Sequence, residues 1–548
     1  MKNILPFAIL LVIVSSCSDD DNNELPVDRF TVDSVFVNNN YVPNNSSINS
    51  VDYADVEIRI TFSDRVDTSS FNKARLVFTG EVDTLYSHYF HDDSRNLVIR
   101  PIDPLMPLAA YRLSFDSGQN MGGTVMNQYT FVIRTQLDST PKFPLLSDDE
   151  LLTLVQEQTF RYFWDYAHPV SGLARERLGS GEMVTTGGSG FGLMAIITGI
   201  ERNFITRQEG FDRLSTIVSF LMDPETEKYN GAFPHWLNGT TGKTIPFSTL
   251  DDGGDLVETA LLMQGLLTVK EYFKNGTALE QALGDSIQVL WEGVDWNWYR
   301  KNDENVLFWH YSLNHGWEMN HQIRGWNEAL IVYVLAAASP THSIHADVYH
   351  QGWARNGNIR NGKSFYDILL PLGEDLGGPL FFAHYSFLGL DPRNLSDQYA
   401  DYFIQNTAHA LINYEYCIDN PRNYVGYSED CWGLTASDIE SGYTASSPTN
   451  DRGVIAPTAA LSSFPYTPVE SMDALKFFYY VLGDRIWGEY GFHDAFNLTT
   501  LWFASSYLAI DQGPVICMIE NYRTGLLWNL FMSNEDVRQG LDKLSFEY

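Results

Sequence analysis

Leu256-Val-Glu-Thr-Ala-Leu-Leu-Met-Gln-Gly-Leu-Leu-Thr-Val269 is apolar on almost every side when it is drawn as a helix. Such a helix is buried all round, whereas a helix with one apolar stripe keeps a face in water. Beyond Ser147 the chain alternates between the two kinds, over about 400 residues. The fully apolar kind recurs at 191–200, 329–338, 457–461 and 501–510, and the striped kind at 151–166, 211–222, 278–291, 398–414 and 469–482. This alternation predicts two concentric rings of helices, an all-α (α/α)6 barrel, over residues 148–548.

The residues before the predicted barrel have a β pattern. Apolar and polar residues alternate over 56–62, 96–100 and 130–134, with Gly, Asn and Asp turns between the short strands. Residues 29–135 therefore predict an all-β, Ig-like β-sandwich that resembles the bacterial Ig-like modules preceding surface enzymes. Residues 136–147, which hold two prolines, predict an interdomain linker.

The N-terminal sequence predicts where in the cell the protein is located. Lys2 precedes a short apolar run, Ile4 to Val14, which fits a secretory signal and is too short to cross a bilayer. Small residues precede Cys17 and acidic residues follow it, so residues 1–17 predict a lipoprotein signal with Cys17 lipidated, and 18–28 an acidic tether. The tether resembles the surface-export signal of some Gram-negative lipoproteins, which implies an outer-membrane lipoprotein at the cell surface or in the periplasm, with the lipid as its only membrane attachment. A cleaved signal with an incidental cysteine is the alternative.

Composition excludes some partners. A net charge of −34 is repelled by phosphate backbones, so nucleic acid is not expected as a partner. Scattered histidines, with His310, His315 and His321 irregularly spaced, and the lack of a CxxC motif predict no metal site, and no other cofactor is expected. Cys417 and Cys431 could pair in an oxidising compartment. The sequence does not predict an oligomeric state.

The densest polar cluster enters the 256–269 helix. Asp255 and Glu258 are three residues apart and share one helical face, and Asp251 lies just upstream in a Gly-bearing loop. Capping by Asp255 with a dipole-favoured Glu258 would explain one or two of these acids, and a calcium loop is a weaker alternative because the spacing fits no EF-hand. Three acids beside an apolar helix favour a functional site.

A fourth acid, Glu328, lies at the head of the 329–338 helix. Burial there would raise its pKa and keep the carboxyl protonated, as a general acid requires. Other loop residues are candidates to surround the same cavity and bind sugar, with Asp494 and Asp511 as further acids. The candidate substrate-binding residues are Asp251, Trp236, Trp317, Arg324, Trp326, His384, Tyr385, Trp432 and Asp438.

Four stretches carry a family resemblance, which spans about 148–535. Asp251 to Ala260, Gly377 to Ser386, Gly433 to Asp438, and Ile510 to Pro514 with Glu520 to Arg523 resemble the bacterial "glycoamylase" domain, which includes glycoside hydrolase family 144. The resemblance implies an inverting hydrolase of β-1,2-glucan or its oligosaccharides on an (α/α)6 barrel. Some members cut internally and others release sophorose. It also implies that Asp251, Asp255 and Glu258 form the essential acidic cluster.

The roles of the acids stay partly open. Glu328 is the expected general acid, and Asp511 and Asp494 are the distal candidates for the general base, while the cluster that includes Asp255 and Glu258 could bind glucose units or orient water. A non-catalytic glycan-binding lipoprotein, a polysaccharide lyase, and a glucoamylase-like hydrolase of another glucan linkage are the alternatives. Four cavity acids argue against a mere binding protein, since buried unpaired carboxylates are costly.

Overall fold

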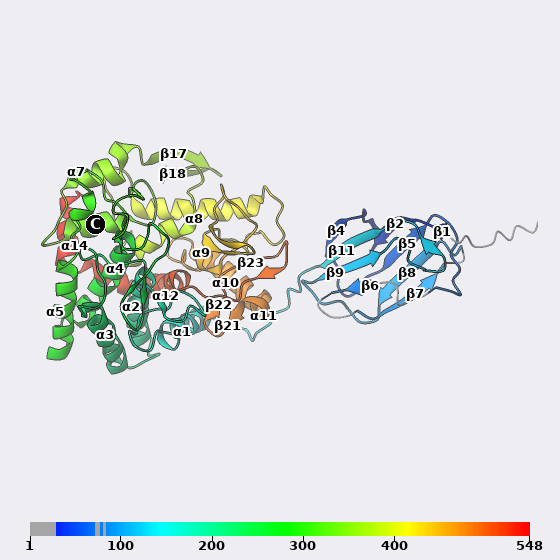
Figure 1. Ribbon diagram of the computed structural model, residues 1–548, viewed down its shortest axis with the longest axis horizontal. Helices are drawn as coiled ribbons and strands as arrows, with labels where there is room; N and C mark the ends of the chain where they lie inside the picture. The colour runs from blue at the N-terminus through cyan, green and yellow to red at the C-terminus, as the bar shows by residue number, and fades with distance from the viewer. Residues whose placement is uncertain (1–28, 72–76, 81–83, 92) are drawn as a thin grey trace, which may run out of the picture. The chain divides into compact units, whose positions relative to one another are not determined.

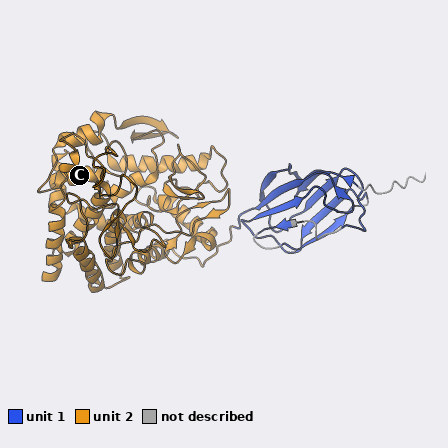
Figure 2. Ribbon diagram, in the orientation of Figure 1, with its two compact units in different colours: residues 1–138 blue, residues 139–548 orange. Residues whose placement is uncertain are grey.

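The computed structural model describes residues 29–71, 77–80, 84–91 and 93–548, which form two compact units (Figure 1 and Figure 2). The division falls between Asp138 and Ser139, inside the segment that the sequence predicts as a linker. The predicted lipoprotein signal with Cys17 and the predicted tether lie outside the described residues. No helix among the described residues combines the length and apolar composition needed to cross a membrane.

The first unit is built from two large β-sheets and one two-stranded parallel sheet. Its strands are β1 (Arg29–Phe30), β2 (Val32–Val37), β3 (Asn40–Tyr41), β4 (Ser46–Val51), β5 (Ile58–Phe62), β6 (Val77–Thr79), β7 (Tyr86–Phe90), β8 (Asn96–Pro101), β9 (Ala110–Phe115), β10 (Thr124–Val125) and β11 (Tyr129–Thr135). One large sheet has the order β3-β2-β5-β8-β7 and the other β4-β11-β9-β6. Neighbours in these two sheets pair antiparallel, except that β4 runs parallel to β11.

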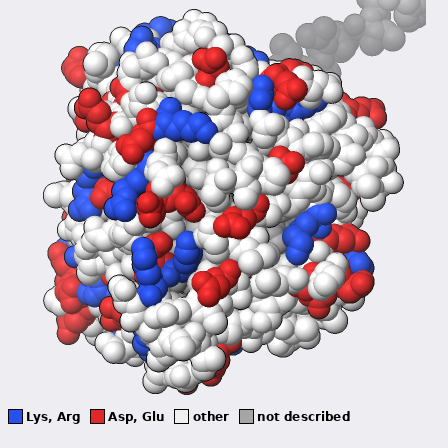
Figure 3. All heavy atoms as spheres, turned by 90° about the vertical axis from the view of Figure 1, so that its left-hand side faces the viewer, with Lys and Arg blue, Asp and Glu red and all other residues white. Residues whose placement is uncertain are grey.

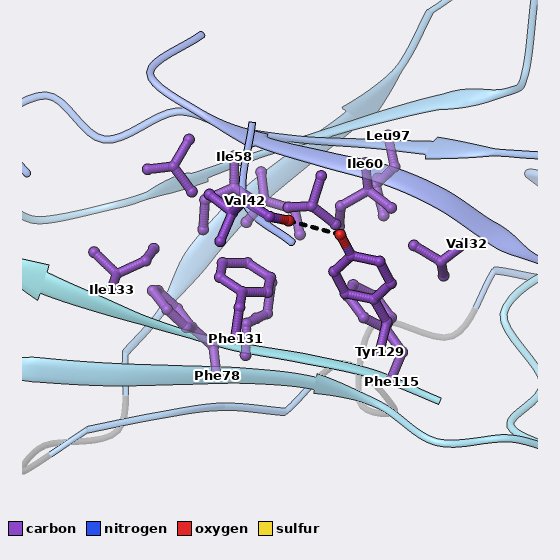
Figure 4. Packing of buried hydrophobic residues seen from close by; sticks show 14 of the residues in the cluster. Val32, Val42, Ile58, Ile60, Phe78, Leu97, Phe115, Tyr129, Phe131 and Ile133 are labelled. Atoms are coloured by element: carbon purple, nitrogen blue, oxygen red, sulfur yellow. Dashed lines mark hydrogen bonds between the residues drawn. The ribbon is translucent and has the colours of Figure 1, made fainter. Parts of the chain in front are cut away.

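The core of the first unit lies between these sheets, as Figure 4 shows. Alternate residues of β5 and β11 are buried, because successive side chains of a strand point to opposite faces. Phe131 of one sheet therefore meets Ile58 and Ile60 of the other. The hydroxyl of Tyr129 donates a hydrogen bond to the carbonyl of Val42 at 2.6 Å, so the polar end of this buried ring is satisfied. The predicted β-structure of 29–135 is confirmed.

The second half of the predicted linker is packed onto the second unit. The backbone N–H of Lys142 donates to the carbonyl of Tyr480, and that of Leu146 donates to the Tyr480 hydroxyl. The ring of Phe143 lies 4.7 Å from that of Tyr479. The second half of the 136–147 segment that the sequence predicts as a linker is therefore part of the packed second unit.

The second unit is mainly helical. Its α-helices are α1 (Asp148–Trp164), α2 (Thr186–Glu201), α3 (Arg207–Met222), α4 (Leu256–Phe273), α5 (Ala278–Glu292), α6 (Leu330–Ala338), α7 (Ala346–Val348), α8 (Tyr402–Asp419), α9 (Pro457–Leu461), α10 (Pro468–Lys476), α11 (Gly483–Ile486), α12 (Ala509–Thr524), α13 (Leu526–Met532) and α14 (Glu535–Lys543). Short 3-10 or π turns are η2 (Trp298–Arg300), η3 (Tyr349–Trp353), η4 (Arg355–Gly357), η5 (Leu380–Ala383), η6 (Tyr385–Leu388) and η7 (Phe477–Val481).

Short strands form small two- and three-stranded sheets in the loops of this unit. They are β12 (Met183–Thr185), β13 (Trp236–Asn238), β14 (Thr244–Ile245), β15 (Gly254–Asp255), β16 (His310–Tyr311), β17 (Arg360–Phe365), β18 (Ile368–Leu372), β19 (Ala436–Ile439), β20 (Gly442–Ala445), β21 (Trp487–Gly488), β22 (Gly491–Phe492), β23 (Phe496–Asn497) and β24 (Trp502–Phe503). The apolar pattern of residues 148–548 predicts helices and none of these short strands.

Most of the predicted helices are confirmed. Helices α2, α4, α6 and α9 are buried along nearly their whole length, whereas α1, α3 and α5 keep one face in water. The predicted helix over 501–510 is wrong. Leu501 has a φ of 60° at the turn before strand β24, and the helix starts only at Ala509. Asp511 to Gly513, expected in a loop, forms the first turn of α12.

Glycine brings the buried helices close together. Helix α2 packs against α4 and α12, and the striped helices α1, α3 and α5 pack on these buried ones. A Cβ on Gly190 would lie 2.2 Å from the carbonyl oxygen of Leu261, and one on Gly265 would lie 2.2 Å from that of Gly190. Only glycine permits this approach, so α2 and α4 are fixed almost in backbone contact.

Charge on the protein surface is mixed in sign. On the face drawn in Figure 3, Lys and Arg side chains are interspersed with Asp and Glu side chains. The strongly negative net charge therefore forms no continuous acidic patch on that face.

Candidate active site

A cavity of about 670 Å³ lies where the N-terminal ends of buried helices meet. Thr185 and Leu508 are the N-cap residues of α2 and α12, Glu258 is in the first turn of α4, and Glu328 lies two residues before α6. The N-termini of helices favour negative charge, so this end of the unit suits carboxylates. The lining residues are Glu176, Arg177, Leu178, Gly179, Ser180, Met183, Thr185, His235, Trp236, Phe247, Val257, Glu258, Leu261, Trp309, Glu328, Phe381, Tyr385, Ala436, Tyr443, Ala445, Leu508 and Ile510.

Asp255 caps helix α4 and stays ionised. Its Oδ1 accepts hydrogen bonds from the backbone N–H groups of Val257 and Glu258, both at 2.9 Å. Its Oδ2 lies 3.1 Å from His235 Nδ1 and 3.4 Å from His310 Nε2. Burial would raise the pKa of Asp255, but the hydrogen bonds and charges of the two histidines outweigh it and hold the pKa far below its ordinary value. Asp255 therefore caps helix α4 with one carboxylate oxygen and contacts two histidines with the other.

Two histidines provide the positive charge of this cluster. Asp251 Oδ2 lies 3.2 Å from His310 Nε2 and 3.6 Å from His235 Nδ1, so Asp251 and Asp255 share both rings. Although burial opposes protonation, hydrogen bonds from His310 to Asp251 and Asp255 raise the pKa of His310 to about 9. Despite the same opposing burial, the charge of Glu258, with Asp251 and Asp255, raises the pKa of His235 well above its ordinary value. Both rings therefore carry positive charge at neutral pH and lie in contact with the side chains of Asp251 and Asp255.

Glu258 faces the cavity from the first turn of α4. Its Oε2 accepts hydrogen bonds from the backbone N–H of Gly187 at 2.6 Å and from the Thr185 hydroxyl at 3.3 Å, both at the start of α2. A Cβ on Gly187 would lie 2.8 Å from that oxygen, so glycine there lets the carboxylate approach the backbone. Burial raises the pKa of Glu258, although the charge of His235 opposes the shift. Its carboxyl group can therefore exchange a proton with a bound molecule.

Glu328 also lines the cavity, at the head of α6. Burial of the carboxyl raises its pKa to about 7, and the charges of Asp255 and Glu258 act in the same direction. Its backbone carbonyl accepts a hydrogen bond from the Ser386 hydroxyl, which fixes the loop before the helix. A carboxyl group with this pKa is protonated in about half of the molecules at neutral pH, which suits a general acid. The placement expected from the sequence is confirmed, while the role stays a prediction.

A second group of acidic residues, Asp438, Asp494 and Asp511, adjoins the cavity residue Arg177. Arg177 lines the cavity, and its guanidinium binds the carboxylate of Asp438 at 3.1 Å. The backbone N–H of Asp438 donates to Asp494 Oδ2 at 2.6 Å. Burial raises the pKa of Asp494 to about 7, and burial with the adjacent Asp494 raises the pKa of Asp511 well above its ordinary value.

Asp494 and Asp511 form a carboxyl pair. Oδ1 of Asp494 and Oδ2 of Asp511 are both buried, and neither has another hydrogen-bond partner among the described residues. One proton shared between the two carboxyl groups satisfies both atoms, as in other paired acids. The pair is not among the lining residues. Burial, and after it the charge of Asp511, raises the pKa values of Tyr385 and Tyr443, which do line the cavity, so a base in the pair would act through these groups or through a bound molecule.

Only part of the predicted aromatic wall lines the cavity. Trp236 and Tyr385 do, as expected. Trp317 instead packs in an aromatic cluster with Trp298, whose ring is 4.8 Å away. Trp326 is 7% exposed and packs on Phe387, so it belongs to the core.

Three other candidates are also placed elsewhere. His384 is 2% exposed and hydrogen-bonds Ser463, and burial lowers its pKa to about 3, so it is a neutral core residue. Trp432 is fully buried and donates its indole N–H to the carbonyl of Glu470. Arg324 is exposed and is not among the lining residues. Proximity to an acid in sequence does not decide which way a side chain points, which is why these assignments fail.

Several cavity residues were not predicted. His235 sits 20 residues before Asp255, and His310 reaches Asp255 only because strands β15 and β16 pair. No local spacing signals either contact. Phe247, Trp309 and Arg177 also line the cavity, from loops whose sequences carry no distinctive motif.

Two features bear on metals and disulfides. His235, Asp251 and Asp255 offer ligand atoms within 4.8 Å of one another and could hold a cation. Protonated imidazole N–H groups account for the same contacts, and a protonated nitrogen cannot ligate a metal.

Cys417 and Cys431 are buried free thiols, so the pairing considered from the sequence is absent between these two described residues.

The chain matches the family model "Glycoamylase", described as "Putative glucoamylase", over residues 320–535. An exo β-1,2-glucooligosaccharide sophorohydrolase (non-reducing end) from Parabacteroides distasonis is 48% identical over 432 residues, which cover 75% of this chain. The matched part is 60% of that relative's length.

Two solved structures are also similar. An endo-β-1,2-glucanase from Chitinophaga pinensis, in complex with sophorotriose and glucose, shares 53% identity with a TM-score of 0.72, covering 74% of this chain and 99% of that one. A β-1,2-glucanase from Parabacteroides distasonis shares 39% identity with a TM-score of 0.71, covering 95% of this chain and 74% of that one. With this identity over nearly the whole length of a relative, the chain belongs to the bacterial glycoamylase family, which includes these β-1,2-glucan hydrolases.

Proposed function

We propose that the protein is an inverting glycoside hydrolase that cleaves β-1,2-glucooligosaccharides and releases sophorose from chain ends. The observation that carries this proposal is Glu328, a cavity-lining carboxyl group whose burial raises its pKa to about 7, in the electrostatic field of Asp255, whose pKa is held far below its ordinary value. The relative named as an exo-acting sophorohydrolase supports the substrate and the product. This chain spans 60% of that relative's length, so the activity is a proposal for this protein.

Glu328 acts as the general acid. Its proton passes to the glycosidic oxygen as the bond from that oxygen to C1 breaks, and a water molecule forms the new bond to C1 from the opposite face. The proton that the water loses goes to a general base. Glu258 in the cavity wall and Asp511 outside the lining are the two candidates, the first placed to contact the water directly and the second through a bound hydroxyl group.

Other cavity residues hold the sugar. Trp236 and Tyr385 offer ring faces to the apolar C–H surfaces of glucose units. The charge of Glu258 and the hydrogen bonds to Asp251 and Asp255 raise the pKa of His235, so it stays protonated at the cavity wall, where its N–H groups can donate to sugar hydroxyls. Arg177, braced by Asp438, is a further donor on the opposite side.

Internal cleavage is the second candidate. The endo-β-1,2-glucanase from Chitinophaga pinensis is 53% identical to this chain, which favours an open site that accepts the middle of a glucan. The two modes differ in their early products. Sophorose alone at the first time points indicates release from chain ends, whereas a ladder of lengths indicates internal cuts.

We also propose the setting of this activity. The helical unit is an (α/α)6 barrel, supported by buried helices packed against half-buried ones, and the N-terminal unit is Ig-like, supported by its two packed sheets. The signal sequence supports lipidation at Cys17 and display at the outer membrane. This localisation requires no membrane contact besides the lipid.

The test is to incubate the purified chain with β-1,2-glucan oligosaccharides, and separately with starch, and to resolve products by length over time. Anomeric configuration of the first product, read by NMR, reports inversion or retention. The variant E328Q is the matched control for a contaminating hydrolase. No cleavage of either glucan by the wild type would contradict the proposal and favour another linkage or a glycan-binding protein.

A further inference from the structure

Phe247 forms part of the cavity lining although it is 51% exposed. It lies in the loop between strands β14 and β15, a loop that carries none of the proposed catalytic residues Glu258 and Glu328. An exposed phenylalanine is common on protein surfaces and by itself signifies little. This one lies at the edge of the one described cavity that holds Glu258 and Glu328.

One face of the Phe247 ring is covered by protein. The ring of His235 lies 4.3 Å away with an interplanar angle of 26°, so the two rings are stacked. The Trp236 ring lies 4.8 Å away and is tilted by 56°. With one face on His235 and half of the residue exposed, the remaining ring surface is open to a molecule in the cavity.

The position of Phe247 is fixed by its backbone. Its N–H donates a hydrogen bond of 2.9 Å to the carbonyl of Asp251, and the N–H of Asp251 donates back to the carbonyl of Ser248. The same turn therefore presents Asp251 to the histidines and Phe247 to the cavity. A side chain held this way loses little conformational entropy when a ligand covers it.

Two more exposed apolar residues line the same cavity from other loops. Leu178 is 41% exposed and Tyr443 is 47% exposed. The cavity thus combines carboxyl groups with apolar surface that faces water, and a pyranose offers the complement, with hydroxyl groups around its edge and C–H groups on its faces.

We propose that Phe247 is a stacking platform for a glucose unit of the substrate, and that it determines how tightly the chain binds rather than how fast the bond breaks. This inference rests on the proposed function, because it requires a glucan in the cavity. Its chemistry is a contact between the C–H face of the sugar and the free face of the ring. His235 supports the platform from behind.

The test compares F247A, F247W and wild type on β-1,2-glucooligosaccharides, with kcat and KM measured separately. The expected result is a roughly tenfold rise in KM for F247A, with kcat changed less than threefold, and a KM near wild type for F247W. The control is Y366A, because Tyr366 is an aromatic residue 37% exposed on the β17–β18 turn and is not among the cavity residues. Its KM should stay unchanged.

The competing role for Phe247 is to shield His235 from water, and it predicts a different result. In that case F247A would shift the pH profile of kcat/KM and leave KM unchanged, and this outcome would overturn the proposal. Equal KM and equal pH profiles would also overturn it. Direct binding of β-1,2-glucooligosaccharides to E328Q and to the E328Q/F247A double variant measures the affinity without turnover. If wild type cleaves no β-1,2-glucan at all, the proposed function fails first, and that failure is distinct from a failure of the Phe247 assignment.

Discussion

His310 lies opposite Asp255 across the two-residue strand pair β15–β16, with its Nε2 atom 3.4 Å from Asp255 Oδ2. The pairing aligns a buried imidazolium with the residue that caps helix α4, and Asp251 lies 3.2 Å from the same nitrogen. The charge of His310 is therefore coupled both to the fold and to the cavity.

The pH dependence of stability follows from this contact. The pKa of His310 is raised from 6.5 to about 9, so its stabilising contribution is complete below about pH 6.5 and is lost as the pH rises through 9. The shift corresponds to an upper limit on the order of 3 kcal/mol. We expect the unfolding free energy of wild type to fall more between pH 6.5 and 9 than that of H310Q.

Tryptophan fluorescence measures this well, because all 13 tryptophans lie after residue 139 and report on the helical unit. The control is H345Q, since His345 is exposed. Parallel pH curves for wild type and H310Q would show that the imidazolium contributes nothing.

We expect Glu328, the proposed general acid, to set the alkaline limit of activity. A general acid must be protonated, and its pKa in the free protein is about 7. We expect kcat/KM to fall about tenfold per pH unit above pH 7, and E328Q to lose roughly a hundred- to ten-thousandfold in kcat. Oligosaccharide affinity, measured by calorimetry, should change little. An E328Q variant with substantial turnover would remove Glu328 from this role.

The same carboxyl group costs stability at high pH. Because the folded pKa lies above the unfolded value, ionisation opposes folding from about pH 4.5 upward, and the cost is complete above about pH 7. E328Q carries no charge there. We therefore expect E328Q to unfold at a higher urea concentration than wild type at pH 8 and at a similar concentration at pH 4.5. A variant less stable than wild type at pH 8 would contradict the buried charge.

Sequence reasoning located the acids and missed their partners for a physical reason. Asp255 and Glu258 are three residues apart on one helix, so their proximity is encoded locally. His235 lies just before strand β13 and His310 lies in β16, and only the tertiary fold brings both to Asp255. The prediction of a helix over 501–510 is wrong because apolar composition does not distinguish a half-buried hairpin strand such as β24 from a buried helix.

The general base can be identified by chemical rescue. Glu258 lines the cavity, whereas Asp511 shares a buried carboxyl pair with Asp494. Removing the base carboxylate should abolish hydrolysis and leave space for azide to attack C1. We expect azide to restore activity to only one of E258A and D511A, with a glycosyl azide of inverted configuration as the product, detected by mass spectrometry and NMR. Rescue of neither variant would exclude Glu258, which is placed to contact the water directly, and would leave Asp511, acting through a bound hydroxyl group, as the candidate.

A buried ion pair near the C-terminal ends of α2 and α12 should stabilise the folded protein without changing the kinetic constants. Glu520 of α12, with a side chain 2% exposed, binds Arg202 after α2 at 2.7 Å and 3.1 Å, and also accepts from Gln156 of α1 at 3.0 Å. Removing this carboxylate leaves a guanidinium without its partner, which typically costs about 3–5 kcal/mol. We expect E520A to lower the urea midpoint strongly while the folded fraction keeps wild-type KM. The control E157A removes an exposed carboxylate of α1 and should change the midpoint little. A small effect of E520A would mean that water replaces the lost partner, and a changed KM would mean that the three helices transmit strain to the cavity.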